Sequence, residues 1–235
     1  MINGKTVFAI IPARGGSKGI PKKNIRLLAE KPLIGWTIDE AKKSKYLDTI
    51  MVSTDSEEIA AISKAYGAEA PFVRPSELAK DETPSNDVII HAVQWLGTNQ
   101  DQKFDILTLL QPTSPLRNCD QIDSALETFI SNPGYKCLVS VKEVEENPYW
   151  MKIIGDDHYL KNFTSQPDTF ARRQDLPKIY ILNGAIYIMR TADFMNYRSF
   201  DVDNTIPFLM DQKTSIDIDS EEDFTLAEII VKKGK

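Results

Sequence analysis

Short apolar runs alternate with helix-like segments through most of this sequence, and this order limits the folds open to it. The apolar runs with the length of buried strands are 6–13, 49–53, 68–73, 104–110 and 137–141. The segments with helical spacing are 33–45, 56–66, 86–96 and 120–130. The run 104–110 has almost no polar face, as is typical of a central parallel strand. The order predicts an α/β fold, with a mostly parallel Rossmann-like sheet and helices on both faces.

The alternation of strand-like and helix-like segments stops between residues 143 and 178, where turn-like pairs such as Asn147-Pro148 separate short strands. Strand-like patterns return at 180–189 and 214–219, and a final helix should begin after Ser220 and close at Gly234. We therefore expect a main domain made of 1–142 and 179–235. Residues 143–178 form a small excursion, which we interpret as a hairpin arm that pairs with a second subunit.

Composition narrows the classes of ligand. The net charge is −6, so the surface as a whole does not favour nucleic acid or an anionic membrane. An anionic ligand would need a local basic site. The two cysteines, Cys119 and Cys137, lack metal or redox spacing, and two separated histidines do not suggest a zinc centre. A metal held by carboxylates would be magnesium or manganese. No apolar run approaches the ~20 residues that span a bilayer, so we expect a soluble, cytoplasmic protein.

A basic, glycine-rich segment, 14–24, follows the first strand. Glycine permits positive φ and close approach to a ligand, and successive backbone N–H groups can cradle a phosphate. The cations of the segment are Arg14, Lys18 and Lys23, which would neutralise a triphosphate. Ser17 and Asn24 are placed to bind ribose or phosphate oxygens. The glycine spacing fits neither a P-loop nor a dinucleotide fingerprint. A flexible basic surface loop is the alternative.

The segment 215–220 alternates strictly between apolar and acidic residues. In a strand, Asp217 and Asp219 would share one face, opposite Ile216 and Ile218. Two carboxylates so placed repel unless a cation lies between them. Opposite a triphosphate that cation would be magnesium, bridging protein and phosphate oxygens. The alternative is a solvated strand face followed by helix capping.

Several of these segments resemble, in order, the acylneuraminate cytidylyltransferases (CMP-sialic acid synthetases), including members that act on legionaminic acid. The matching segments are 11–18 with 23–24, 52–55, 73–75, 111–117, 183–187 and 215–219. The string Gln-Pro-Thr-Ser-Pro-Leu-Arg at 111–117 is the most specific of them. Its last residue, Arg117, could reach a ligand or tie down its own loop.

The resemblance implies roles for individual residues. Its nucleotide site comprises Ala13, Arg14, Gly15, Ser17, Lys18, Lys23, Asn24, Arg74 and Ser85. Within that set, Arg14, Lys18 and Lys23 hold the phosphates, and Ser17, Asn24, Arg74 and Ser85 contact ribose and cytosine. Asp217 and Asp219 bind magnesium and, with the phosphate-binding cations, form the catalytic group. Gln111 and Tyr187 lie at the sugar, as do Lys152 and Arg173 from the dimerisation arm.

The resemblance implies in-line attack by the anomeric hydroxyl of a nine-carbon acidic sugar on the α-phosphorus of CTP. Pyrophosphate leaves, and a CMP-sugar forms. Ile181 stands where many bacterial members carry an arginine, which keeps legionaminic and pseudaminic acids open as substrates. The same applies to Phe200-Asp201, where some members have an aromatic pair. A nucleotide-binding regulator without catalysis is the alternative of another class, and the glycine spacing disfavours a dinucleotide-dependent oxidoreductase.

Overall fold

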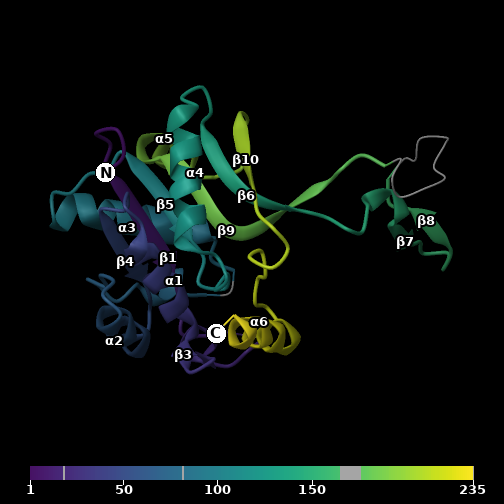
Figure 1. The fold of residues 1–235 in the computed structure, drawn as a ribbon, viewed down its shortest axis with the longest axis horizontal. Helices are drawn as coiled ribbons and strands as arrows, with labels where there is room; N and C mark the ends of the chain where they lie inside the picture. The colour runs from purple at the N-terminus through teal and green to yellow at the C-terminus, as the bar shows by residue number, and fades with distance from the viewer. Residues whose placement is uncertain (18, 81, 165–175, 235) are drawn as a thin grey trace.

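A six-stranded sheet forms the centre of the molecule in this computed structural model, which describes residues 1–17, 19–80, 82–164 and 176–234 (Figure 1). Its strands are β1 (Val7–Pro12), β4 (Thr49–Ser53), β5 (Ile106–Leu110), β6 (Cys137–Glu143), β9 (Tyr180–Arg190) and β10 (Thr205–Leu209), in the order β10-β6-β9-β5-β1-β4. β9 runs antiparallel to β5 and β6, whereas the other pairings are parallel. The prediction of a mostly parallel sheet is confirmed.

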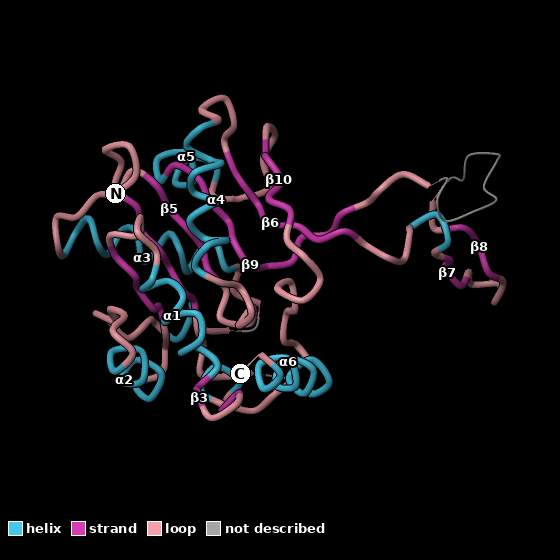
Figure 2. The backbone as a smooth tube through the Cα atoms, viewed as in Figure 1, coloured by secondary structure: helices cyan, strands magenta, loops and turns pink. Residues whose placement is uncertain are grey.

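Helices cover both faces of this sheet, as the alternating pattern predicts (Figure 2). One face packs against α1 (Leu33–Lys43), α2 (Glu57–Ala65) and α4 (Cys119–Ser131). The other packs against α3 (Ser85–Asn99) and α5 (Thr191–Tyr197). α6 (Glu221–Lys233) buries Phe224 and Ala227 against Ile20, close to the small hairpin of β2 (Leu27–Leu28) and β3 (Lys31–Pro32). In the described part of the chain, none of the helices has the length and apolarity needed to cross a bilayer.

Helix starts follow capping chemistry, because a side-chain oxygen can accept the first free N–H groups. Ser220 caps α6, as predicted, and it also forms a capping box with Asp223. Asn118 and Gln121 form the same arrangement at α4. At α2 the cap is Ser56, which leaves the neighbouring Asp55 carboxylate for another role.

Two predicted strands are wrong. Residues 68–73 make only single bridges, Met51 with Glu69 and Thr54 with Val73, and Pro71 lacks the N–H that a continuous ladder needs. Residues 214–219 form no strand either. Ile218 N donates to Thr113 O at 2.9 Å and Ser215 N donates to Asp211 O at 3.1 Å, but these bonds form no ladder. The strand beside β6 is β10, which contains Pro207. A proline is tolerated at a sheet edge, but it hides the strand in the sequence.

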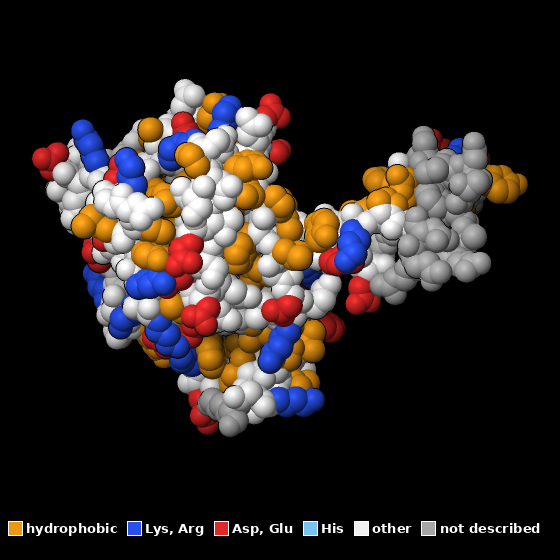
Figure 3. Space-filling view, turned by 45° about the horizontal axis from the view of Figure 1, so that its top comes forward, with side chains coloured by type: hydrophobic (Ala, Val, Ile, Leu, Met, Phe, Trp, Pro, Cys, Tyr) orange, Lys and Arg blue, Asp and Glu red, His pale blue; other side chains and the backbone are white. Residues whose placement is uncertain are grey.

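The described residues of the predicted arm, 143–164 and 176–178, leave the body of the molecule and include a hairpin of β7 (Lys152–Ile154) and β8 (Leu160–Asn162) after η3 (Pro148–Trp150) (Figure 1). All six hairpin strand residues are exposed. Large apolar side chains are among them, with Ile154 74 % and Leu160 71 % exposed. Figure 3 shows further hydrophobic side chains along the stem of this arm.

Gly67, which follows α2, has a φ of +91°. An L-residue in this region costs about 1–2 kcal/mol. We expect Gly67→Ala to lower the free energy of unfolding by about that amount, measured by denaturant titration. Gly97→Ala is the matched control, because Gly97 lies in α3 with open space around it. This change should raise the free energy of unfolding by up to about 1 kcal/mol. Equal effects of the two changes would contradict this reading.

Cys137 is buried in the core, and burial raises the pKa of its thiol to about 12, although a hydrogen bond with Thr205 opposes the shift. Because the thiolate is the reactive form, a raised pKa leaves little of it at mildly alkaline pH. We expect iodoacetamide to modify Cys137 only after the protein is unfolded, as followed by intact mass. Rapid modification of both cysteines in the folded protein would contradict this burial. Cys119 is half-buried and offers the internal comparison.

Candidate active site

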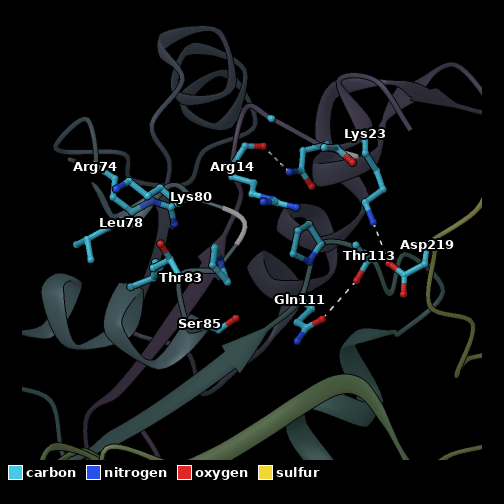
Figure 4. A pocket seen from close by; sticks show the side chains of 16 residues that line it. Arg14, Lys23, Arg74, Leu78, Lys80, Thr83, Ser85, Gln111, Thr113 and Asp219 are labelled. Carbon is cyan, nitrogen blue, oxygen red and sulfur yellow. Dashed lines mark hydrogen bonds and ion pairs between the residues drawn. The ribbon is translucent and has the colours of Figure 1, made fainter. Parts of the chain in front are cut away.

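A cavity of about 380 Å³ lies at the carboxyl ends of β1 and β5 (Figure 4). Parallel strands end at a common edge, and Ala13 N donates to Ser53 O at 3.0 Å where β1 and β4 finish. The lining residues are Pro12, Arg14, Gly16, Ser17, Lys23, Asn24, Arg74, Leu78, Lys80, Thr83, Ser85, Val88, Gln111, Pro112, Thr113 and Asp219. We name this the first cavity. It collects most of the predicted nucleotide-site residues.

The first cavity is lined by the cations Arg14, Lys23, Arg74 and Lys80, on a chain whose net charge is −6. Figure 4 shows Arg74 and Lys80 together on one side, with Lys23 and Asp219 on the other. Burial lowers the pKa of Arg74, while Asp55, whose Oδ1 lies 3.6 Å from Arg74 NH2, opposes the shift. The lining is therefore a local basic site on an acidic protein, as an anionic ligand requires.

The glycine-rich segment is tied to the end of the 214–219 segment. Lys23 Nζ donates to Ile218 O at 2.7 Å and to Asp219 Oδ1 at 3.1 Å. A Cβ on Gly19 would lie 2.6 Å from Asp219 O, which is closer than such atoms approach. Glycine at position 19 thus permits the two segments to touch. Positive φ is not the reason for Gly15 and Gly16, because neither has it.

Two further hydrogen bonds order the same loop. Asn24 Nδ2 donates to Arg14 O at 2.9 Å, and Gly15 N donates to Asp55 Oδ1 at 2.9 Å. The Gly15 amide is therefore engaged by protein. Asn24 Oδ1 is buried and has no hydrogen-bond partner among the described residues, so this side chain keeps one acceptor for a ligand.

The two carboxylates differ in exposure. Asp219 lines the first cavity and its side chain is 78 % exposed, whereas Asp217 is half-buried. Burial raises the pKa of Asp217. A hydrogen bond with Thr113 opposes this effect, and the nearby Asp219 charge adds to it. Asp217 Oδ1 is buried and has no hydrogen-bond partner in the part of the chain that the structure describes. An unsatisfied carboxylate oxygen beside a second carboxylate is a donor set suited to a divalent cation.

No group of three or more histidine, cysteine, aspartate or glutamate side chains converges as a metal site within the residues that the structure describes. Two carboxylates nevertheless fit magnesium, which is commonly held by one or two carboxylates together with substrate phosphates. Asp217 and Asp219 are the residues that would hold it.

A buried polar network fixes the approach of this acidic segment to the sheet. Asn183 Nδ2 donates to Ser215 Oγ at 2.8 Å, and Ser140 Oγ donates to Asn183 Oδ1 at 2.5 Å. The next residue, Gly184, has a φ of +75°. A Cβ added to Gly184 would lie 3.3 Å from Gln111 Oε1 and 3.5 Å from Asp217 Oδ2. β9, Gln111 and Asp217 therefore meet at one point.

A second cavity, also of about 380 Å³, shares Ser85 and Gln111 with the first. Its wall includes Leu109, Val139, Leu182, Tyr187, Phe200 and Asp201. The rings of Tyr187 and Phe200 are 5.3 Å apart between centroids. The structure thus brings Gln111 and Tyr187, both predicted at the sugar, to one cavity beside the basic site.

The remaining predicted residues are placed differently. Ala13 and Gly15 lie beside the first cavity without lining it in the described structure. Lys152 lies on the exposed arm hairpin and bonds to Asn162. Lys18 and Arg173 lie outside the described residues.

Sequence reasoning missed several lining residues, of which Lys80, Thr83 and Thr113 are polar. Thr113 stands inside the 111–117 string, which was a usable signal. Lys80 and Thr83 follow Arg74 in a polar loop that includes η2 (Ser76–Leu78), and no periodic pattern marks them.

The α/β fold, the basic cavity at its strand ends and the adjoining carboxylate pair define a protein of the nucleotidyltransferase class. The family model described as "Cytidylyltransferase" matches residues 8–233. The chain belongs to the cytidylyltransferase family, which confirms the predicted resemblance.

Curated relatives cover almost the whole chain. It is 40 % identical over 235 residues to a CMP-N,N'-diacetyllegionaminic acid synthase of Legionella pneumophila, covering 96 % of each chain. It is 37 % identical over 228 residues to the "Post-translational flagellin modification protein B" of Campylobacter coli, covering 97 % of this chain and 95 % of that one. An N-acylneuraminate cytidylyltransferase of Escherichia coli is 35 % identical over 227 residues, and this chain spans 52 % of its length.

The fold has solved counterparts. A structure of CMP:2-keto-3-deoxy-manno-octonic acid synthetase complexed with CTP aligns with a TM-score of 0.74, at 17 % identity, over 98 % of this chain and 100 % of that one. At this identity the likeness establishes the fold alone.

Proposed function

We propose that this protein transfers CMP from CTP to the anomeric hydroxyl of a nine-carbon acidic sugar and releases pyrophosphate. The observation that carries the proposal is the pair of cavities joined at Ser85 and Gln111. One is basic, as a triphosphate requires, and the other has the aromatic and polar wall that suits a sugar. The activities for which related cytidylyltransferases are named support the same reaction.

The chain's own residues bind and align the reactants. Arg14, Lys23, Arg74 and Lys80 neutralise the phosphates, so the anionic sugar can approach the α-phosphorus. Ser85 and Gln111 stand at the junction, where the attacking hydroxyl must meet the nucleotide. Holding the two reactants in line supplies most of the catalysis in such a transfer. Lys18 joins the phosphate-binding cations in this proposal.

Magnesium dependence is part of the proposal, with manganese as a substitute. The support is the donor set of Asp217 and Asp219, in which the buried Asp217 Oδ1 has no hydrogen-bond partner among residues 1–17, 19–80, 82–164 and 176–234. When bound, the metal would offset phosphate charge and favour deprotonation of the attacking hydroxyl. Asp217 and Asp219 would fix its position, and Lys23 would bridge Asp219 to the phosphates.

The arm belongs to the proposal as a dimerisation element, separate from the catalytic domain of 1–142 and 179–235. Exposed apolar side chains on its hairpin, Ile154 and Leu160 among them, support pairing with a second copy. Lys152 and Arg173 would then reach the partner's sugar site. Analytical ultracentrifugation should give the mass of a dimer, and a monomer at micromolar concentration would contradict this part. We also propose a cytoplasmic location, where CTP is made.

The test of substrate identity is a sugar panel. Sialic, legionaminic and pseudaminic acids are incubated separately with CTP and magnesium, and each product is identified by mass. Formation of one CMP-sugar in preference to the others assigns the substrate. CTP binding without any CMP-sugar would instead favour the nucleotide-binding regulator.

A further inference from the structure

Arg117 is a buried cation beneath the junction of the two cavities. Its side chain is 1 % exposed, and it ranks among the largest fully buried side chains of the protein. Its Nε and NH2 have no hydrogen-bond partner in the described structure. Burial lowers its pKa to about 9, although the charge of Glu40 opposes the shift, so Arg117 remains protonated at neutral pH. A buried charge in such surroundings is costly, which makes stability a poor reason for its presence.

Its one engaged nitrogen joins two backbone segments. Arg117 NH1 donates to Gln111 O at 3.2 Å and to Ala185 O at 2.9 Å. Gln111 directly follows β5, and Ala185 lies in β9 next to Gly184. These strands are neighbours that run antiparallel, and the guanidinium connects them where they reach the cavities.

The two connected segments carry the side chains of the junction. Gln111 lines both cavities, and its Oε1 accepts from Thr113 Oγ1 at 3.4 Å. A Cβ added to Gly184 would lie 3.3 Å from the same oxygen, so the Gly184 backbone is close to the Gln111 amide. A small displacement of either backbone would therefore change where the Gln111 amide points. The described cations of the first cavity, Arg14, Lys23, Arg74 and Lys80, stand on other segments of the chain.

We propose that Arg117 is a positioning residue, which holds the Gln111 amide at the junction for the acceptor sugar through the carbonyls of Gln111 and Ala185. The inference rests on the proposed function and adds to it that the Gln111 amide, although Gln111 lines both cavities, serves the acceptor sugar rather than the nucleotide. Arg117 itself touches neither substrate.

The test uses the full-length protein with Arg117→Met, which keeps an unbranched buried side chain but removes the donors, and Arg117→Lys, which keeps a cation. CTP affinity is measured by calorimetry without sugar, and kcat and KM are measured for the preferred sugar. We expect Arg117→Met to leave CTP affinity within error and to lower kcat/KM for the sugar roughly 10- to 100-fold, as expected for a misplaced contact group. Arg117→Lys should recover part of that loss.

Ser114→Ala is the matched control, because Ser114 is fully buried in the same loop and its hydroxyl has no partner in the described structure. It should behave as the parent does. An equal loss of CTP affinity and sugar use in Arg117→Met, parent-like sugar kinetics, or failure of both Arg117 variants to fold would overturn the proposal. A parent that binds CTP but acts on none of the sugars would instead refute the proposed function, so the two failures differ.

Discussion

Asp219→Ala should fold as the parent does and lose at least about 100-fold in turnover, because several kcal/mol of charge stabilisation depend on the metal position. The Asp219 side chain is 78 % exposed, so its removal creates no cavity in the core. Lys23 keeps its bond to Ile218 O. The measurements are the melting temperature and the rate of pyrophosphate release at saturating magnesium.

Glu222→Ala is the control for that loss. Glu222 is an exposed carboxylate three positions further on, outside both cavities. It should release pyrophosphate at the parent rate. Near-normal turnover of Asp219→Ala at saturating magnesium would count against the metal assignment.

Gly19→Ala is expected to cost about 100-fold in kcat/KM, as a displacement of about 1 Å at a reacting centre does. The added methyl group would lie 2.6 Å from Asp219 O, and a backbone atom cannot yield as a flexible side chain can. The glycine-rich loop and the acidic segment must therefore separate. Steady-state kinetics with CTP and sugar provide the measurement.

Gly134→Ala serves as the comparison, because a Cβ there meets nothing within 4 Å and the residue is exposed in a loop. Its kinetics should equal those of the parent. If Gly19→Ala also matched the parent, the close contact of the two segments would have no importance for the reaction.

The parts of the fold that the sequence predicts are those with local causes. The strand at 49–53 and the start of α6 at Ser220 follow from an apolar run and from capping chemistry. Because parallel strands end at a common edge of the sheet, Arg14 and Gln111, which follow β1 and β5, lie together at that edge. β10 and the irregular path of 214–219 depend on tertiary partners, such as Thr113 O for Ile218 N, which no local pattern reveals.

The candidate site divides in the same way. The basic loop and the spacing of the two carboxylates are visible in the sequence. The alternation of apolar and acidic residues in 215–220 results from the packing of Ile218 in the core and not from a sheet ladder. Lys80 carries no periodic signal and enters the cavity only through the path of its loop. For Arg117 the sequence left two roles open, and its bonds to two carbonyls show that it ties down its own loop.

The proposed reaction needs both substrates and the metal. The most direct measurement is pyrophosphate release from CTP with magnesium, with and without a nine-carbon acidic sugar, and again after chelation with EDTA. We expect release that requires the sugar and stops on chelation. Release without any sugar, or no release with sialic, legionaminic or pseudaminic acid while CTP still binds, would contradict the proposed transfer.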